Sequence, residues 1–201
     1  MTERIKITET ISYIKATEDP LSADVGIVEG KDFVWVFDVG ACEGAKKLLS
    51  GIIKPKKAVL SHFHPDHTAN ISDLEFDEVF AGANTFGYTK AGTTVAGDVF
   101  ADDGIKIHIF LLPSSHAKGS VGMETGDYAF LGDATYPTAK KGKTCYNASV
   151  LKEEIDVLKN LSAKYFLLSH DKNFICKREE VIARLEEIYS KRDPKESYIW
   201  L

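Results

Sequence analysis

The sequence predicts a mixed α/β protein, a four-layer αββα sandwich of two mixed β-sheets flanked by helices. Two observations favour this class. The first third of the chain is a run of strand patterns, whereas the last third alternates helices with a strand. Strands interrupted by helices in both halves are typical of two packed sheets with helices outside. Periodicity alone also permits one mixed sheet, so this alternative stays open.

Each predicted element follows from a local pattern. Strands are predicted where residues alternate or form short apolar runs, at 5–15, 24–29, 32–38, 58–61, 105–112, 121–124, 128–131 and 165–169. Helices are predicted where apolar residues recur on one face, at 43–52, 149–161 and 177–190. A strand followed by a short helix is expected within 73–92, and 134–143 reads as a loop.

Composition and charge narrow the range of functions. At 201 residues the chain is long enough for one sizeable core, so we expect a single domain over 1–201. A net charge of −5 makes nucleic acid an unlikely partner, and no stretch approaches the roughly 18 apolar residues of a membrane span. We therefore expect a cytoplasmic protein, as a monomer or homodimer, without a membrane or nucleic-acid partner. Cys42, Cys145 and Cys176 lie far apart, which predicts reduced thiols.

A dense group of metal-binding residue types follows the predicted strand 58–61, in the segment His62-Phe63-His64-Pro65-Asp66-His67. Two histidines spaced by two at a strand end point to the same side if the chain stays extended, so His62 and His64 can share one metal. The proline then breaks the extension, which lets Asp66 and His67 turn toward the same cavity. The spacing therefore predicts up to two metal ions. Imidazole and carboxylate ligands suit zinc first, with iron or manganese as alternatives.

This segment resembles the signature of the metallo-β-lactamase superfamily, with a glyoxalase II-like ligand pattern. Three further segments resemble family motifs: 112–120 around His116, 130–133 ending at Asp133, and 167–170 ending at His170. The resemblance implies that His116 joins His62 and His64 on a first metal. It implies that His170 joins Asp66 and His67 on a second metal, and that Asp133 bridges both.

Other residues receive secondary roles or none. Asp38, in the sequence Phe37-Asp38-Val39-Gly40, resembles an aspartate that supports the site from behind the ligands. Tyr136 and Lys140 follow Asp133 in the predicted loop and are candidate contacts for an anionic substrate. His108, the one histidine left over, alternates out of phase with its apolar neighbours, so we expect it to face solvent.

Two metal ions joined by a carboxylate can hold a hydroxide near neutral pH. We therefore expect a hydrolase that cleaves an ester, thioester or lactone bond in a small molecule with a metal-bridging hydroxide, which Asp66 orients. Asp133 argues against a true β-lactamase, because most of those enzymes have cysteine or serine there. Departures from the family pattern at Ser114, Ser115 and Asp171 leave the substrate open. A phosphodiesterase or nuclease, a di-iron oxidoreductase and a metal-dependent binding protein remain alternatives.

Overall fold

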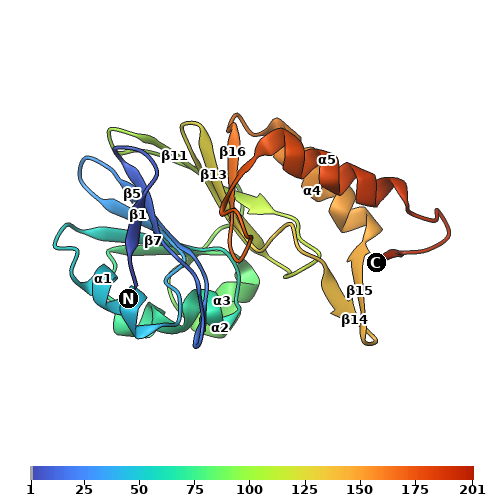
Figure 1. The fold of residues 1–201 in the computed structure, drawn as a ribbon. Coiled ribbons are helices and arrows are strands. Elements are labelled where there is room, and N and C mark those ends of the chain that lie inside the picture. Colours follow the sequence, from blue (N-terminus) through green and yellow to red (C-terminus); the bar gives the residue numbers. More distant parts are fainter. Residues whose placement is uncertain (1) are drawn as a thin grey trace.

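Two β-sheets pack face to face, and helices cover the outer side of each sheet (Figure 1). The computed structural model describes residues 2–201. In Figure 1 the helices α1, α2 and α3 lie beside the sheet that contains β1, β5 and β7, and the helices α4 and α5 lie on the opposite side, beyond β13 and β16. The predicted αββα arrangement of two mixed sheets is confirmed.

The first sheet has seven strands in the order β1-β2-β5-β6-β7-β8-β9. Their bounds are Arg4–Lys6, Ile11–Ile14, Val25–Glu29, Val34–Phe37, Lys56–Leu60, Glu78–Ala81 and Thr93–Thr94. The pairs up to β6 are antiparallel, and those from β6 to β9 are parallel. A parallel pair needs a crossover, which the helices α1 (Glu43–Ser50) and α3 (Ala83–Thr89) supply.

The second sheet has six strands in the order β10-β11-β12-β13-β16-β17. Their bounds are Val99–Asp102, Lys106–Leu112, Ser120–Thr125, Tyr128–Gly132, Tyr165–Leu168 and Ile175–Lys177. The single parallel pair, β13 with β16, encloses the helix α4 (Ala148–Asn160), and α5 (Arg178–Ser190) follows β17. The carboxyl ends of β13 and β16 therefore meet at one edge of this sheet.

Three apolar cores hold the layers together. The core between the sheets contains Trp35 and Phe37 from the first sheet and Phe130 from the second. A second core joins the six-stranded sheet to α4 and α5, and a third joins the seven-stranded sheet to α1. A close fit marks the sheet interface, because a Cβ at Gly26 would lie 2.4 Å from a ring carbon of Phe130. Burial of this kind fixes how the strand ends of the two sheets face each other.

Two segments differ from the predicted pattern. The alternation at 5–15 is split into β1 and β2, because the Thr8 hydroxyl accepts the backbone N–H groups of Thr10 and Ile11 and closes a turn. The expected loop at 134–143 contains β14 (Thr138–Lys140), which pairs with β15 (Lys143–Asn147) and, through it, with β18 (Tyr198–Trp200). A further small hairpin consists of β3 (Thr17–Glu18) and β4 (Leu21–Ser22).

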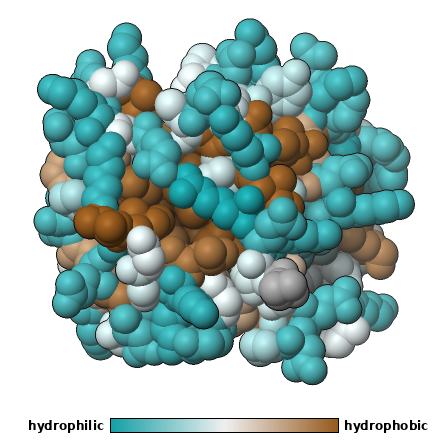
Figure 2. Space-filling view, turned by 60° about the vertical axis from the view of Figure 1, so that its left-hand side comes forward, coloured by the Kyte–Doolittle hydropathy of each residue, from teal (hydrophilic) through white to brown (hydrophobic). Residues whose placement is uncertain are grey.

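Hydrophilic side chains cover much of the face drawn in Figure 2, with apolar side chains gathered between them near its centre. Most of the large exposed apolar residues are separated along the chain, among them Ile53, Tyr88 and Phe100, whereas Trp200 and Leu201 are adjacent. Within residues 2–201, no helix is both long enough and apolar enough to cross a membrane.

Candidate metal centre

The seven predicted ligand residues lie together where strands from both sheets end. β7 ends at Leu60, separated by one residue from the His62 to His67 segment, and β13 ends at Gly132, directly before Asp133. The turn at Gly132 needs glycine, because its φ is +57° and a Cβ there would lie 2.7 Å from the Ser61 hydroxyl. Such a turn aims the next side chain back across the sheet interface.

A short helix arranges the cluster itself. α2 (Pro65–Thr68) begins with proline at its first position, where the ring fixes φ and the missing N–H is not needed. His64 therefore stays extended as the residue before the helix, while His67 lies in the helix and is fully buried. The sequence predicted that Pro65 would end the extension, and the structure confirms this turn.

The first group of ligand atoms consists of three imidazoles, those of His62, His64 and His116. The Nδ1 atom of His64 lies 2.8 Å from Nε2 of His62 and 3.1 Å from Nε2 of His116. Three nitrogens that converge in this way match the histidine set of a tetrahedral metal site.

The second group mixes carboxylates with imidazoles and contains Asp66, His67, Asp133 and His170. Oδ2 of Asp66 lies 2.9 Å from Nε2 of His170 and 3.4 Å from Nε2 of His67. Oδ2 of Asp133 lies 3.3 Å from Nε2 of His67 and 3.6 Å from Nε2 of His116, which belongs to the first group. Asp133 thus faces both groups.

Asp38 lies behind the candidate ligands. It is completely buried, and its carboxylate accepts the Ser61 backbone N–H and the Ser61 hydroxyl, both at 2.7 Å. The same carboxylate lies 2.8 Å from Nδ1 of His67. A proton held on Nδ1 by this contact leaves Nε2 of His67 free to bind a metal. Ser61 was not singled out from the sequence, because one serine at a strand end carries no distinctive signal.

The donor atoms fit metal ions. Nε2 of His67 and Oδ1 of Asp133 are buried and have no hydrogen-bond partner among residues 2–201, and a buried polar atom without a partner is costly. Burial lowers the pKa of His62, and its neighbouring histidines lower it further, so this imidazole stays neutral and can bind a metal. Burial also acts to lower the pKa of His67, but Asp38 and Asp133 outweigh it and raise that pKa to about 10. This excess of carboxylate charge indicates a position for a cation.

Asp24 ties the second group to the first sheet. Its buried carboxylate accepts the backbone N–H of Ala16 at 2.9 Å and that of His170 at 3.1 Å. Its own backbone N–H donates to the Ser169 hydroxyl at 2.8 Å. His170 has a φ of +59°, an uncommon conformation for a residue with a side chain. Asp24 therefore holds the backbone of a candidate ligand in place.

A cavity of about 750 Å³ opens onto the ligands. Its lining includes Lys15, Lys172 and five candidate ligand residues, namely His64, Asp66, His116, Asp133 and His170. Neither Tyr136 nor Lys140, the expected substrate contacts, is among the lining residues. The Tyr136 hydroxyl donates to the Ser169 carbonyl oxygen at 2.7 Å, and the Lys140 ammonium lies 3.5 Å from the centre of the Tyr198 ring. Those intramolecular contacts take up both side chains.

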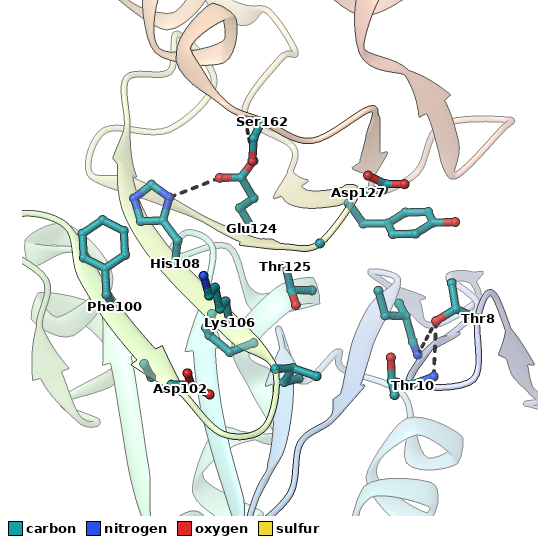
Figure 3. A pocket seen from close by; sticks show the side chains of 16 residues that line it. Thr8, Thr10, Phe100, Asp102, Lys106, His108, Glu124, Thr125, Asp127 and Ser162 are labelled. Carbon is teal, nitrogen blue, oxygen red and sulfur yellow. Dashed lines mark hydrogen bonds and ion pairs between the residues drawn. The ribbon is translucent and has the colours of Figure 1, made fainter.

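Figure 3 shows a larger cavity of about 990 Å³, lined by none of the candidate ligands. It adjoins the start of β11, whereas the candidate ligand His116 follows the end of that strand. The seven residues of β11 span roughly 20 Å of extended chain between the two places. Its lining residue His108 is half-buried, which corrects the expectation of a solvent-facing side chain. The ring stacks on Phe100, with 4.5 Å between ring centres, and lies 3.3 Å from a Glu124 oxygen. Residues on the neighbouring strands therefore cover the His108 ring. Within residues 2–201, neither group of possible metal ligands includes His108.

Solved structures share this fold. A metallo-β-lactamase from Pontibacter korlensis is 17% identical with a TM-score of 0.66, over 96% of this chain and 100% of that one. The DIM-1 metallo-β-lactamase is 16% identical with a TM-score of 0.72, over 92% and 97%. A variant of the flavo-di-iron protein from Thermotoga maritima is 15% identical with a TM-score of 0.69, over 97% of this chain and 64% of that one.

No family model matches the chain, and no curated protein matches its sequence. The likeness to solved structures nevertheless covers almost the whole chain, so the chain has the metallo-β-lactamase fold. The predicted resemblance is confirmed at the level of the fold.

Proposed function

We propose that this chain is a dinuclear metal-dependent hydrolase that cleaves an ester, thioester or lactone bond in a small molecule. One observation carries the proposal: two groups of ligand atoms lie side by side, and Asp133 faces both. His62, His64 and His116 would hold one ion, Asp66, His67 and His170 the other, and Asp133 would be shared. Zinc suits this donor set, and iron or manganese would also be accepted.

When bound, two such ions supply a hydroxide nucleophile near neutral pH and polarise the carbonyl that is attacked. The side chains of the protein complete the reaction. Burial acts to raise the pKa of Asp66, but the hydrogen bond from His170 and the positive charges of His67 and His170 together outweigh it and keep that pKa below its ordinary value. Asp66 is therefore ionised at neutral pH. Its Oδ2 atom can orient the attacking water, accept its proton and pass that proton to the leaving group.

A di-iron oxidoreductase is the second candidate. Two of the four ligands in the second group are carboxylates, a donor type that iron accepts, and a flavo-di-iron protein shares the fold. A phosphodiesterase or nuclease remains a third reading, because paired metal ions also support phosphoryl transfer. Metal analysis together with visible and EPR spectra of protein purified under native metal supply distinguishes the di-iron oxidoreductase from the hydrolase and the nuclease.

An activity screen of metal-reconstituted protein tests the proposal. The substrates are a lactone, a glutathione thioester, a carboxylic ester, a phosphodiester and a β-lactam. We expect hydrolysis of at least one of the first three, loss of that activity on chelation, and recovery when metal is restored. A flat screen with both ions bound would contradict the hydrolase and favour the oxidoreductase or a binding protein. Cleavage of the phosphodiester alone would favour the nuclease reading.

A further inference from the structure

Two lysines without partners lie on the wall of the cavity that opens onto the ligands. Lys15 follows β2 in the first sheet, and Lys172 lies between β16 and β17 in the second. Some other lysines of the chain form ion pairs, such as Lys57 with Glu78 and Lys164 with Asp127. Lys15 and Lys172 form no ion pair with any residue of 2–201, and both side chains are exposed.

An aromatic contact between the sheets fixes the segments that carry these lysines. The rings of Tyr13 and Phe174 stack with 4.3 Å between their centres and 26° between their planes. Each ring is two residues from one lysine, since Tyr13 precedes Lys15 and Phe174 follows Lys172. Lys15 and Lys172 both line the cavity, so the stack holds the two lysine-bearing segments side by side on its wall. Both rings also line this cavity.

Two of the three carboxylates that line the cavity outside the ligand set already have partners. Asp24 accepts the backbone N–H groups of Ala16 and His170, and Asp171 accepts that of Asn173 and lies 3.7 Å from the Arg184 guanidinium. Glu18 is the one other acidic residue of the lining outside the ligand set. Since neither lysine forms an ion pair with any of these carboxylates, the two ammonium groups are available to an anion that enters the cavity.

We propose that Lys15 and Lys172 form a clamp for an anionic group of the substrate, so that the substrate is a small ester or thioester bearing a separate carboxylate. This inference rests on the proposed function and adds the substrate class to it. The Tyr13 and Phe174 rings contact the apolar part of the molecule between its carboxylate and the bond that is cleaved. Lys15 and Lys172 are thus specificity-determining residues, and the reaction itself depends on the metal ligands.

Two esters of equal acyl length test the clamp. 4-Nitrophenyl hemisuccinate carries a free carboxylate, and 4-nitrophenyl butyrate does not. The variants are Lys15→Gln, Lys172→Gln and the double variant, and Lys195→Gln, another exposed lysine without an ion pair, is the control. We expect the native protein to prefer the hemisuccinate. Each single variant should lower kcat/KM for that ester about tenfold, mainly through KM, and change the butyrate about twofold or less.

The clamp would be overturned if the native protein hydrolysed the two esters at equal rates, or if the variants lost kcat/KM equally for both esters. The same loss of kcat/KM in Lys195→Gln would also overturn it. Calorimetric titration of the metal-loaded proteins with succinate and with butyrate provides a readout that needs no turnover. Succinate should bind the native protein more tightly than the double variant, and the difference should shrink at high salt. If the whole activity screen is flat while both metals are bound, the hydrolase proposal fails. The succinate titration then still decides the clamp.

Discussion

The carboxylates around the candidate metal centre divide into two kinds according to their contacts. Asp38 and Asp24 are saturated with hydrogen bonds from the protein, and each holds a histidine or its backbone in place. Asp133 keeps a buried oxygen without a partner, and Asp66 contacts candidate ligands through Oδ2. Carboxylates of the first kind orient ligands, and those of the second kind are free to coordinate.

Removal of Asp24 tests the orienting role at the level of one residue. We expect Asp24→Ala to weaken binding of the second ion between about 10- and 100-fold, because His170 loses the partner of its backbone N–H. The first ion, on the three-histidine group, should bind nearly as before. Competition with a chromophoric chelator measures both affinities.

Asp103→Ala is a matched control. Asp103 is also a buried carboxylate, and it accepts N–H groups of Asp32, Phe33 and Trp35 in a turn region far from the ligands. Both variants should lower Tm, but the control should retain both metal affinities. Equal weakening of the second ion in both variants would mean that loss of stability, and not loss of orientation, is the cause.

The cluster from His62 to His67 could be recognised in the sequence because its members are local and their spacing carries the chemistry. His116, Asp133 and His170 could be added through motifs at strand ends. The contact between Asp24 and His170 joins residues 146 positions apart, and no local pattern marks it. Lys15 and Lys172 escaped notice for the same reason, since they become neighbours of the site only when the sheets pack. Tyr136 and Lys140 were chosen by closeness in sequence to Asp133, which does not determine where a side chain points.

Among the elements, α4 carries a buried carboxyl group that the proposed reaction does not use. Glu154 lies on the face of α4 that packs against the six-stranded sheet, with 0% exposure. Neither of its oxygens has a hydrogen-bond partner among residues 2–201. Burial raises its pKa well above the ordinary value of 4.5, and only the charge of Arg184 opposes this shift.

This placement predicts that stability depends on pH. Because the pKa of Glu154 is higher in the folded chain than in the unfolded chain, the folded state keeps the proton longer. Stability should therefore fall as pH rises from about 4.5 toward the folded-state pKa. We expect Glu154→Met to remove this contribution and to stabilise the chain at pH 8 by about 1–3 kcal/mol.

Thermal unfolding of native protein, Glu154→Met and Glu153→Met between pH 4.5 and 8 checks this prediction. Glu153 is the exposed neighbour on the same helix and is the control. The gain in Tm from Glu154→Met should grow with pH, whereas Glu153→Met should show no such trend. A gain that is the same at both ends of the range would show that Glu154 is not protonated in the folded state.

Long, strongly periodic elements could be predicted from the sequence. α4, α5 and β11 lie where their apolar patterns placed them, within a few residues at each end. The small sheet of β14, β15 and β18 could not be predicted, because its strands are short and two of them join residues more than 50 positions apart. The pattern of 138–147 alone is polar enough to read as a loop, and its strands form through pairing with the C-terminal segment.

In the whole molecule, the candidate centre exists because the two sheets present their strand ends to each other. The first sheet supplies the His62 to His67 segment and Asp24, and the second supplies His116, Asp133 and His170. The fit of Phe130 against Gly26 and the stack of Tyr13 on Phe174 hold the sheets in this relation. Asp133 reaches from the second sheet to His67 of the first.

The number of metal ions bound per chain is the most direct test of the centre with its shared Asp133. The protein is reconstituted with zinc, dialysed, and analysed by mass spectrometry of its metal content, beside Asp133→Ala and the control His108→Ala. We predict two ions in the native protein, two in His108→Ala, and one or fewer in Asp133→Ala together with loss of most hydrolysis. A native protein that binds fewer than two ions, or an Asp133→Ala variant that binds two as tightly as the native chain, would contradict the account.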